Sequence, residues 1–323
     1  MPALPGVWRA RALLSTMQRV KAPSAESAIS IRGLTKRYGK LTAVSNLDLE
    51  VDQGEILGFL GLNGAGKSTT IRILLDLLRP TGGRAFILGH DCQTDGLRVR
   101  ALAGYLPGEL GIYSDLTGRE VLDFLAKLNG KPIERQHRRQ LQERLGFSDG
   151  DLRRKLREYS TGMKRKLGLL QALQADPPLL ILDEPTEGLD PLAQESFYQL
   201  LADLKLRGRT VFMSSHVLSE VARVCDRVAL LRKGELALFA TVEELRKLAA
   251  RPVRVLFAED VSAPVLPPHH EIVSLEPRLW SLRVEGLLGP LLRMLATLPV
   301  ADIEVEEPRL EDVLIKYYQK EQE

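Results

Sequence analysis

Two segments contain the residue types from which a catalytic site can be built. Residues 61–69 read Gly-Leu-Asn-Gly-Ala-Gly-Lys-Ser-Thr and fit the phosphate-binding pattern G-x-x-x-x-G-K-[ST]. Residues 179–185 read Leu-Leu-Ile-Leu-Asp-Glu-Pro, an apolar run that ends in two adjacent carboxylates. Backbone N–H groups and a lysine can bind phosphates, while carboxylates can bind Mg²⁺ and polarise water. The pair therefore predicts a site that binds a nucleoside triphosphate with Mg²⁺ and hydrolyses it.

The flanks of the first segment place it between a strand and a helix. Residues 55–60 indicate a short buried strand, and apolar residues at helical spacing predict a helix over Lys67–Leu78. In that context Lys67 is expected to reach the β- and γ-phosphates and the Ser68 hydroxyl to bind Mg²⁺. The residues expected to surround the phosphates are Gly61, Leu62, Asn63, Gly64, Ala65, Gly66, Lys67, Ser68 and Thr69. The alternative is a glycine-rich turn that binds no ligand.

The carboxylates follow a run that suits the centre of a parallel sheet. Residues 179–182 contain no polar side chain, so we expect a strand that is buried on both faces. Asp183 then lies at the carboxyl end of that strand, where open α/β sheets bind ligands, and is a candidate Mg²⁺ partner. Glu184 points elsewhere and is a candidate to polarise the attacking water. The alternative is that both acids only cap the following turn.

Four further segments occur in a fixed order around these two: Tyr38, residues 159–166, residues 187–191 and Ser214-Ser-His216. Over residues 28–245 this set resembles the nucleotide-binding domain of ATP-binding cassette (ABC) transporters. The resemblance implies that Tyr38 stacks on adenine and that His216 contacts the γ-phosphate and the attacking water.

The resemblance also implies a shared site between two subunits. Ser160, Thr161 and Gly162 match the signature motif, which contacts the γ-phosphate bound by the opposite subunit. Gly188 to Asp190 match the D-loop at the dimer seam. The implied catalytic residues are Glu184 and His216, the implied ligands of ATP include Asp190, and the implied cofactors are ATP and Mg²⁺.

The sequence departs from the family pattern at two places. The signature usually reads Leu-Ser-Gly-Gly-Gln, whereas residues 159–163 read Tyr-Ser-Thr-Gly-Met. In the Q-loop, residues 104–113, Gly108 stands where the family has a glutamine that helps to bind Mg²⁺ and couples the nucleotide to the membrane partner. Glu109 is a candidate surrogate for that glutamine.

Composition bounds the class of protein. The chain has 323 residues, 44% of them hydrophobic, which suits one large α/β domain and a smaller one. No run of 18 apolar residues predicts a membrane span. A net charge of +3 is too small to indicate a nucleic-acid partner, and Cys92 and Cys225 fit a reducing compartment without disulfides.

The pattern divides the chain into three parts. Residues 1–27 carry Arg9, Arg11, Arg19 and Lys21 and predict a disordered or accessory extension. Residues 28–250 predict the phosphate-loop cassette, an α/β fold with a layered sheet core. Within it, residues 89–175 are predicted to form a helical subdomain that meets the membrane partner. Thr241 and Glu244 form a capping box for a helix that ends near Ala249.

A boundary is predicted at Arg251-Pro252. Residues 251–323 predict a small α+β domain with strands near 253–257, 271–275, 280–284 and 301–305, a helix over 287–298 and a last helix from Leu310. This domain resembles the C-terminal appendage of drug- and antibiotic-exporter ATPases.

Taken together, the patterns predict the ATPase subunit of an ABC exporter. It pairs with a second copy or a homologous ATPase and powers a separate integral-membrane permease, as a peripheral protein on the cytoplasmic face of the membrane. The alternatives are a soluble ABC ATPase that acts on the ribosome or on nucleic acid, and a phosphoryl-transferring kinase. The kinase does not account for the signature and the D-loop. The cargo is not specified by the sequence.

Overall fold

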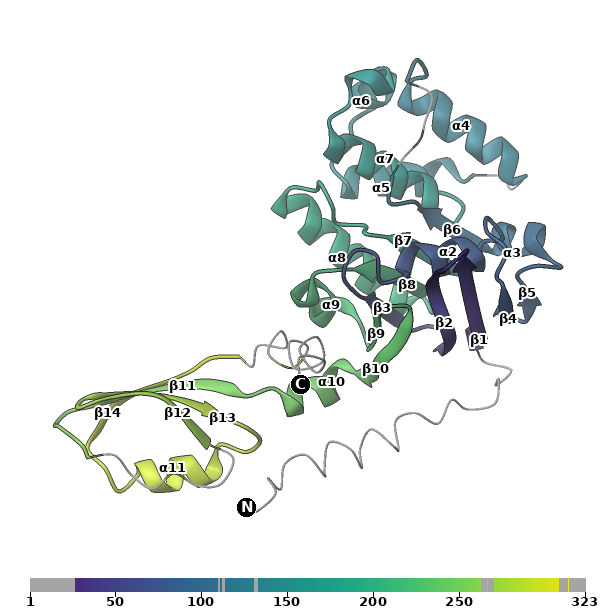
Figure 1. The fold of residues 1–323 in the computed structure, drawn as a ribbon. Coiled ribbons are helices and arrows are strands. Elements are labelled where there is room, and N and C mark those ends of the chain that lie inside the picture. The colour runs from purple at the N-terminus through teal and green to yellow at the C-terminus, as the bar shows by residue number, and fades with distance from the viewer. Residues whose placement is uncertain are drawn as a thin grey trace. The chain divides into compact units, whose positions relative to one another are not determined.

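The computed structural model describes residues 27–109, 111, 114–130, 133–262, 266, 270–307 and 313, and the chain forms two compact units, Met1–Phe239 and Ala240–Glu323 (Figure 1). The division falls inside strand β10 (Glu235–Thr241), earlier than the predicted boundary at residues 250 and 251. Arg251 and Pro252 are not a linker, because both lie in β11 (Arg251–Phe257). Proline is tolerated there because it stands at the start of the strand. Of the predicted extension, residues 1–26 lie outside the described residues and Ser27 begins a strand.

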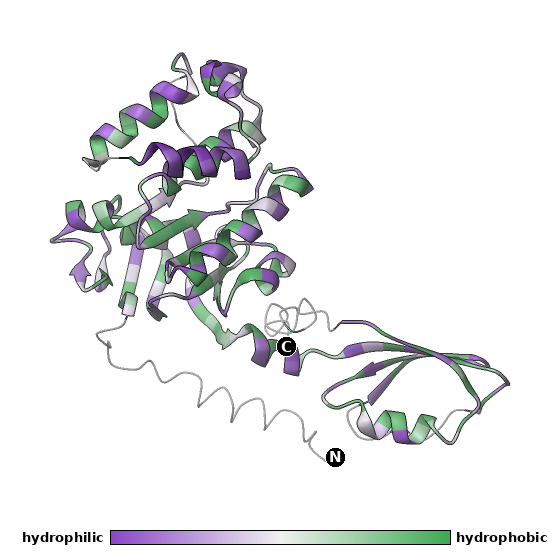
Figure 2. Cartoon of the chain, turned by 180° about the vertical axis from the view of Figure 1, so that it is seen from behind, coloured by the Kyte–Doolittle hydropathy of each residue, from purple (hydrophilic) through white to green (hydrophobic). Residues whose placement is uncertain are grey.

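A six-stranded sheet forms the centre of the first unit, with the order β10-β9-β3-β8-β7-β6. Strand β3 pairs in parallel with β8 and β9, and β7 pairs in parallel with β8 and β6. The strands are β3 (Ile56–Leu60), β6 (Ala103–Leu106), β7 (Leu179–Asp183), β8 (Thr210–Ser215) and β9 (Arg227–Arg232). Every residue of β3, β7 and β8 is buried, as the apolar runs predict for central parallel strands. Figure 2 shows these central strands in green.

An antiparallel sheet, which the alternating pattern did not predict, lies beside the parallel one. Its order is β2-β1-β4-β5, and its strands are β1 (Ser27–Tyr38), β2 (Leu41–Asp52), β4 (Gly82–Ile87) and β5 (His90–Asp91). Ile29 and Val44 from this sheet share one hydrophobic core with Phe59, Ile71 and Phe212. This shared core fixes helix α2 between the two sheets (Figure 1).

The helices of the first unit are α2 (Lys67–Leu74), α3 (Gly96–Leu102), α4 (Gly118–Asn129), α5 (Arg135–Arg144), α6 (Asp149–Arg153), the 3₁₀ helix η1 (Leu156–Glu158), α7 (Thr161–Leu173), α8 (Pro191–Leu206) and α9 (Leu218–Val224). Helix α2 ends at Leu74 rather than at Leu78, because Asp76 adopts a left-handed backbone with φ 55°. The helical segment predicted over residues 89–175 also begins too early, because β5 and β6 belong to the sheets. From α4 onward the segment is helical.

The second unit is a small α+β domain. Its sheet has the order β12-β13-β11-β14, with β12 (His270–Glu276), β13 (Leu279–Val284) and β14 (Val300–Val305), and every pairing is antiparallel. Helix α11 (Gly289–Leu295) packs on one face, where Leu291 joins Val255, Phe257 and Trp280 in a separate core. Helix α10 (Val242–Leu248) opens with the predicted capping box of Thr241 and Glu244. Of the last helix predicted, only residue 313 is described.

Candidate functional site

The phosphate-loop segment connects the buried strand β3 to helix α2. Gly64 and Gly66 have φ angles of 82° and 107°, which a side chain rarely adopts. A Cβ on Gly66 would also lie 2.3 Å from the Ala43 carbonyl oxygen, so the antiparallel sheet approaches the loop closely. Lys67, Ser68 and Thr69 follow in the first turn of α2, where backbone N–H groups are unpaired and the helix dipole is positive. This end of α2 suits an anion.

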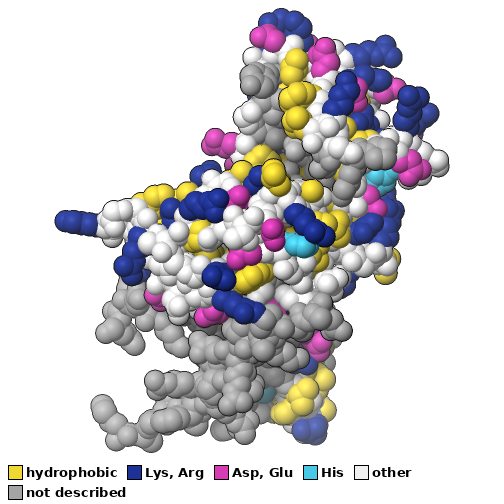
Figure 3. Space-filling view, turned by 90° about the vertical axis from the view of Figure 1, so that its right-hand side faces the viewer, with side chains coloured by type: hydrophobic (Ala, Val, Ile, Leu, Met, Phe, Trp, Pro, Cys, Tyr) yellow, Lys and Arg dark blue, Asp and Glu magenta, His cyan; other side chains and the backbone are white. Residues whose placement is uncertain are grey.

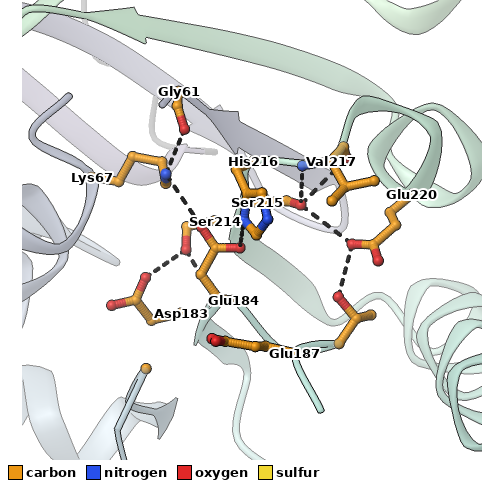
Figure 4. A network of polar contacts seen from close by, with 12 residues as sticks. Gly61, Lys67, Asp183, Glu184, Glu187, Ser214, Ser215, His216, Val217 and Glu220 are labelled. Atoms are coloured by element: carbon orange, nitrogen blue, oxygen red, sulfur yellow. Dashed lines mark hydrogen bonds and ion pairs between the residues drawn. The ribbon is translucent and has the colours of Figure 1, made fainter. Parts of the chain in front are cut away.

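Lys67 is 6% exposed and points back across the loop. Its Nζ donates to the Gly61 carbonyl oxygen at 2.5 Å and lies 3.2 Å from Glu184 Oε1 (Figure 4). The structure therefore joins the two segments that the sequence singled out: the ammonium group of the loop contacts one carboxylate of the strand end.

Asp183 ends β7 and is 5% exposed. Ser214, which lies opposite it in the parallel register of β8, donates from Oγ to Asp183 Oδ1 at 2.5 Å. The Glu184 backbone N–H donates to the same Ser214 oxygen at 3.0 Å. Sequence reasoning gave Ser214 no role of its own. The signal was present, since two parallel strands that end together place polar residues side by side.

Glu184 points away from its neighbour, as Figure 4 shows. Its backbone is left-handed with φ 50°, a strained conformation for a residue with a side chain, and such strain is concentrated at functional sites. One carboxylate oxygen faces Lys67, and the other lies 2.9 Å from His216 Nδ1. Because a carboxylate only accepts, the proton of this contact belongs to Nδ1. Glu184 is thus held between a cation and an imidazole.

Hydrogen bonds to Glu220 connect the loop after Glu184 with the end of β8, which precedes His216. Thr186 Oγ1 donates to Glu220 Oε2 at 2.8 Å, and Ser215 Oγ lies 3.3 Å from the same oxygen. The Val217 backbone N–H donates to Ser215 Oγ at 2.9 Å. Glu220, in the first turn of α9, therefore holds the loop after Glu184 against the strand end that carries His216 (Figure 4). Sequence reasoning missed this glutamate because nothing local distinguishes it from a helix-start acid.

The oxygen atoms near the loop suit Mg²⁺ in kind. Asp183 Oδ2 faces Gly108, where an added Cβ would lie 3.4 Å away, and Ser68 lies in the first turn of α2. Mg²⁺ prefers oxygen ligands and usually keeps one or two carboxylates, phosphates and waters rather than a full protein cage. Consistent with this, the described residues contain no cluster of three His, Cys, Asp or Glu able to hold a metal.

The signature residues begin helix α7. Ser160 is its N-cap, and Oγ accepts the Met163 backbone N–H at 3.2 Å. Thr161 and Gly162 follow, and a Cβ on Gly162 would lie 2.7 Å from the Gly188 carbonyl oxygen. The signature and the D-loop therefore contact each other within one chain, and a side chain at position 162 would clash with the D-loop backbone.

Asp190 caps helix α8. Its Oδ1 accepts the Ala193 backbone N–H at 2.8 Å, and this hydrogen bond lowers the pKa of the Asp190 carboxyl. Tyr38 ends β1 with 47% exposure, and the Lys36 Nζ lies 5.0 Å from its ring centroid. An exposed aromatic face beside a lysine suits a stacked base, but among the described residues Tyr38 forms no hydrogen bond with Asp183 or Glu184.

Gly108 lies beside Asp183 and Glu109 is exposed on the protein surface. The segment is held instead by a residue that sequence reasoning missed, Arg165 of α7, which donates to the Gly108 carbonyl oxygen at 2.9 Å. No local pattern marks Arg165 as different from the basic residues on either side of it.

A groove of about 400 Å³ runs between the sheets and the helical segment. Its apolar walls come from the end of α2, from β6, from α4 and from α7. Lining residues include Leu75, Leu77, Tyr105, Leu128 and Ile133. Leu77 and Leu128 are 55% and 67% exposed, so the groove presents apolar surface to solvent.

A family model described as ABC transporter matches residues 44–187. An uncharacterized ABC transporter ATP-binding protein of Nostoc sp. is 41% identical over 209 residues, which are 64% of this chain and 62% of that protein. Daunorubicin resistance ATP-binding protein DrrA3 of Streptomyces coeruleorubidus is 33% identical over 303 residues, 90% of this chain and 96% of its own length. Bacitracin transport ATP-binding protein BcrA of Bacillus licheniformis is 37% identical over 244 residues, 75% of this chain and 79% of its own length.

Solved structures agree on the fold. An ATP binding subunit of an ABC transporter matches with a TM-score of 0.63 and 29% identity over 68% of this chain and 92% of its own. The ATP-binding cassette MJ0796, a dimer bound to ADP and Pi, matches with a TM-score of 0.61 and 24% identity over 66% of this chain and 98% of its own. The chain belongs to the ABC transporter family: it is an ATP-binding protein with that family's ATPase domain, and it is related to the drug- and antibiotic-exporter branch.

Proposed function

We propose that this chain is the ATPase subunit of an exporter, and that it works as a dimer on the cytoplasmic face of the membrane beside a separate permease. The observation that carries the proposal is the convergence of Lys67, Glu184 and His216. These residues come from three elements that are far apart in the sequence, yet they form a chain of contacts of 3.2 and 2.9 Å.

The proposed chemistry follows from these contacts. Lys67 and the loop N–H groups bind the β- and γ-phosphates of ATP, while Glu184 accepts a hydrogen bond from the attacking water and orients it. His216 donates a hydrogen bond to Glu184 Oε2 and so fixes the direction in which Oε1 points. Ser68 and Asp183 would hold Mg²⁺, which would neutralise phosphate charge when bound. Ser214 prevents Asp183 from rotating.

The second copy supplies the signature. Ser160 and Gly162 lie at the N-terminus of α7, where backbone N–H groups suit a γ-phosphate. The contact of Gly162 with Gly188 supports the placement of the signature and D-loop on one dimer surface. Dimeric relatives of this fold, such as MJ0796, support the same arrangement.

We propose the apolar groove beside β6 as the docking site for the permease. Its walls include the exposed Leu77 and Leu128, and they also include the start of the Q-loop at Gly104. Among the described residues we find no helix with the length and hydrophobicity of a membrane span. The relatives named for daunorubicin resistance and bacitracin transport suggest a drug or antibiotic as cargo. The second unit, Ala240–Glu323, has its own core, and we assign it a regulatory or dimer-supporting role.

The rival proposal, a soluble ABC ATPase on the ribosome or on nucleic acid, finds less support. Figure 3 shows a face on which acidic side chains are scattered among the basic ones, and Arg138, Arg144 and Arg157 are each paired with an acid. A phosphate backbone is bound by Lys and Arg side chains that neutralise its charge, and a carboxylate paired with such a side chain competes with the phosphate for it.

Co-purification tests the proposal. The full chain, tagged and expressed in the cells that it comes from, is expected to remain with the detergent-solubilised membrane fraction and to hydrolyse ATP there. A protein that hydrolyses ATP but fractionates with ribosomes or DNA would refute the exporter assignment.

A further inference from the structure

Arg165 is a buried arginine in the second turn of α7, and the proposed chemistry does not use it. Its side chain is 6% exposed. Nε donates to the Glu187 carbonyl oxygen at 3.2 Å, and Nη1 donates to the carbonyl oxygens of Pro107 at 3.0 Å and Asp183 at 3.4 Å. Nη2 donates to the Gly108 carbonyl oxygen at 2.9 Å and to Glu187 Oε2 at 3.4 Å. A guanidinium carries five N–H donors in a rigid fork, so each donor has its own acceptor.

Four of these five acceptors are backbone carbonyls, and they come from three segments. One segment is the Pro107-Gly108 turn after β6, the second is the end of β7, and the third is the loop that leads to α8. Contacts to the backbone fix where a segment lies whatever its side chains are. Arg165 therefore joins the helix that begins with the signature to the strand end that carries the catalytic carboxylates.

The contacts of Arg165 matter more because Gly108 has no side chain of its own. An added Cβ there would lie 3.4 Å from Asp183 Oδ2, so a longer side chain at this position would reach the carboxylate directly. Glycine has no such side chain. The connection between this turn and the Asp183 strand end runs instead through the Arg165 fork, which holds the carbonyl oxygens of both residues.

The fork also makes the three segments move together. Burial lowers the pKa of Arg165, while the carboxylates of Glu187, Asp183 and Glu184 oppose this effect. A buried charge is strongly unfavourable unless its hydrogen bonds are all made. If one segment moved alone, a buried N–H would lose its acceptor, so partial separation is disfavoured.

We infer that Arg165 is a positioning residue that makes α7, the Pro107-Gly108 turn and the Asp183–Glu187 loop one mechanical unit. When the signature of α7 engages the ATP of a second copy, the displacement is transmitted through Arg165 to the carboxylates of its own site. The inference rests on the proposed function, because it assumes that the two copies share their ATP sites.

The first arm of the test needs no nucleotide chemistry. Amide hydrogen exchange is measured on the full chain, on Arg165→Met and Arg165→Lys, and on Arg209→Met as a control. Arg209 is a partly buried arginine that pairs with Asp176 outside the site. Loss of the fork is expected to speed exchange at least about tenfold in residues 104–109 and 184–190, with residues 61–69 unchanged.

The second arm measures ATP hydrolysis and ATP affinity separately. Arg165→Met is expected to lower kcat at least about tenfold, equivalent to about 1.4 kcal/mol of activation free energy, with the Kd for ATP within about twofold of wild type. Arg165→Lys keeps the charge without the fork and is expected to restore only part of kcat. Arg209→Met is expected to match wild type.

Three results would overturn the inference. If Arg165→Met changed neither amide exchange nor kcat, the hydrogen bonds of Arg165 would transmit nothing. If amide exchange became faster but kcat stayed the same, these hydrogen bonds would have no effect on hydrolysis. A parallel loss of ATP affinity, with faster exchange throughout the first unit, would show a purely structural role. A wild-type chain without ATPase activity would refute the proposed function instead, and the exchange arm would still decide whether the tether exists.

Discussion

Lys67 Nζ lies 3.2 Å from Glu184 Oε1, so the ammonium group of the phosphate loop is paired with the carboxylate proposed to orient the attacking water. A γ-phosphate that binds Lys67 competes with Glu184 for the same cation. Binding of ATP is therefore expected to release Glu184 from Lys67 toward the water, while His216 keeps hold of its other oxygen.

Lys67→Ala is expected to weaken ATP binding. The change leaves the phosphate charge uncompensated, and a hydrogen bond to a charged group contributes about 1.5–3 kcal/mol, so the Kd for ATP is expected to rise at least about tenfold. Isothermal titration measures the Kd, and Lys247→Ala, which removes an exposed lysine from α10, serves as the control. An unchanged Kd would remove Lys67 from this role.

Ser214→Ala is expected to slow hydrolysis without weakening ATP binding. The change removes the hydrogen bond to Asp183 and leaves the Glu184 N–H without its acceptor, so both carboxylates lose their orientation. A lost hydrogen bond to a charged group suggests a decrease in kcat of at least about tenfold. Ser196→Ala, which changes a half-buried serine of α8 outside the site, is the control. Equal turnover in both variants would show that Asp183 and Glu184 hold their positions without Ser214.

Glu109→Ala tests the surrogate for the missing glutamine. Glu109 is exposed and follows β6, whose Gly104 and Tyr105 line the groove proposed for the permease, so we expect transporter-coupled hydrolysis to fall more than the basal rate of the isolated subunit. The two rates are compared in reconstituted membranes and in solution, with Glu235→Ala as a surface control. If both rates are untouched, Glu109 is no surrogate and coupling runs through other residues of the segment, such as the backbone held by Arg165.

A chain that ends at residue 252 is expected to stay folded and to bind ATP with wild-type affinity. The first unit has its own core, and every residue proposed to contact ATP precedes residue 239. Circular dichroism and ATP titration check this. An insoluble fragment, or one without ATP affinity, would show that the two units fold together.

The phosphate loop and the carboxylates were predictable because each is a contiguous segment whose neighbours fix its geometry. The strand before Gly61, the helix after it and the buried run before Asp183 all appear in the structure. The capping box of Thr241 and Glu244 was predictable for the same reason, since three residues of spacing define it.

Contacts between distant segments were not predictable in this way. The pairing of Ser214 with Asp183 depends on strand order, and Arg165 depends on how three loops meet around one side chain. The early end of α2 depends on the left-handed turn at Asp76, although the apolar spacing continues to Leu78. The antiparallel sheet escaped prediction because charged and polar residues interrupt the apolar ones in β1 and β2, so neither strand has a long apolar run.

The most direct test of the central claim is the ATP-dependent dimer of Glu184→Gln. The amide keeps the shape of the side chain and loses the negative charge, so it cannot polarise water as a carboxylate does. ATP is then expected to bind between two copies and to remain intact. On a sizing column with ATP, the variant is expected to elute as a stable dimer and to hydrolyse ATP at least about a hundredfold more slowly than wild type, which is about 2.7 kcal/mol of activation free energy. Turnover at the wild-type rate, or a monomer at saturating ATP, would contradict the account.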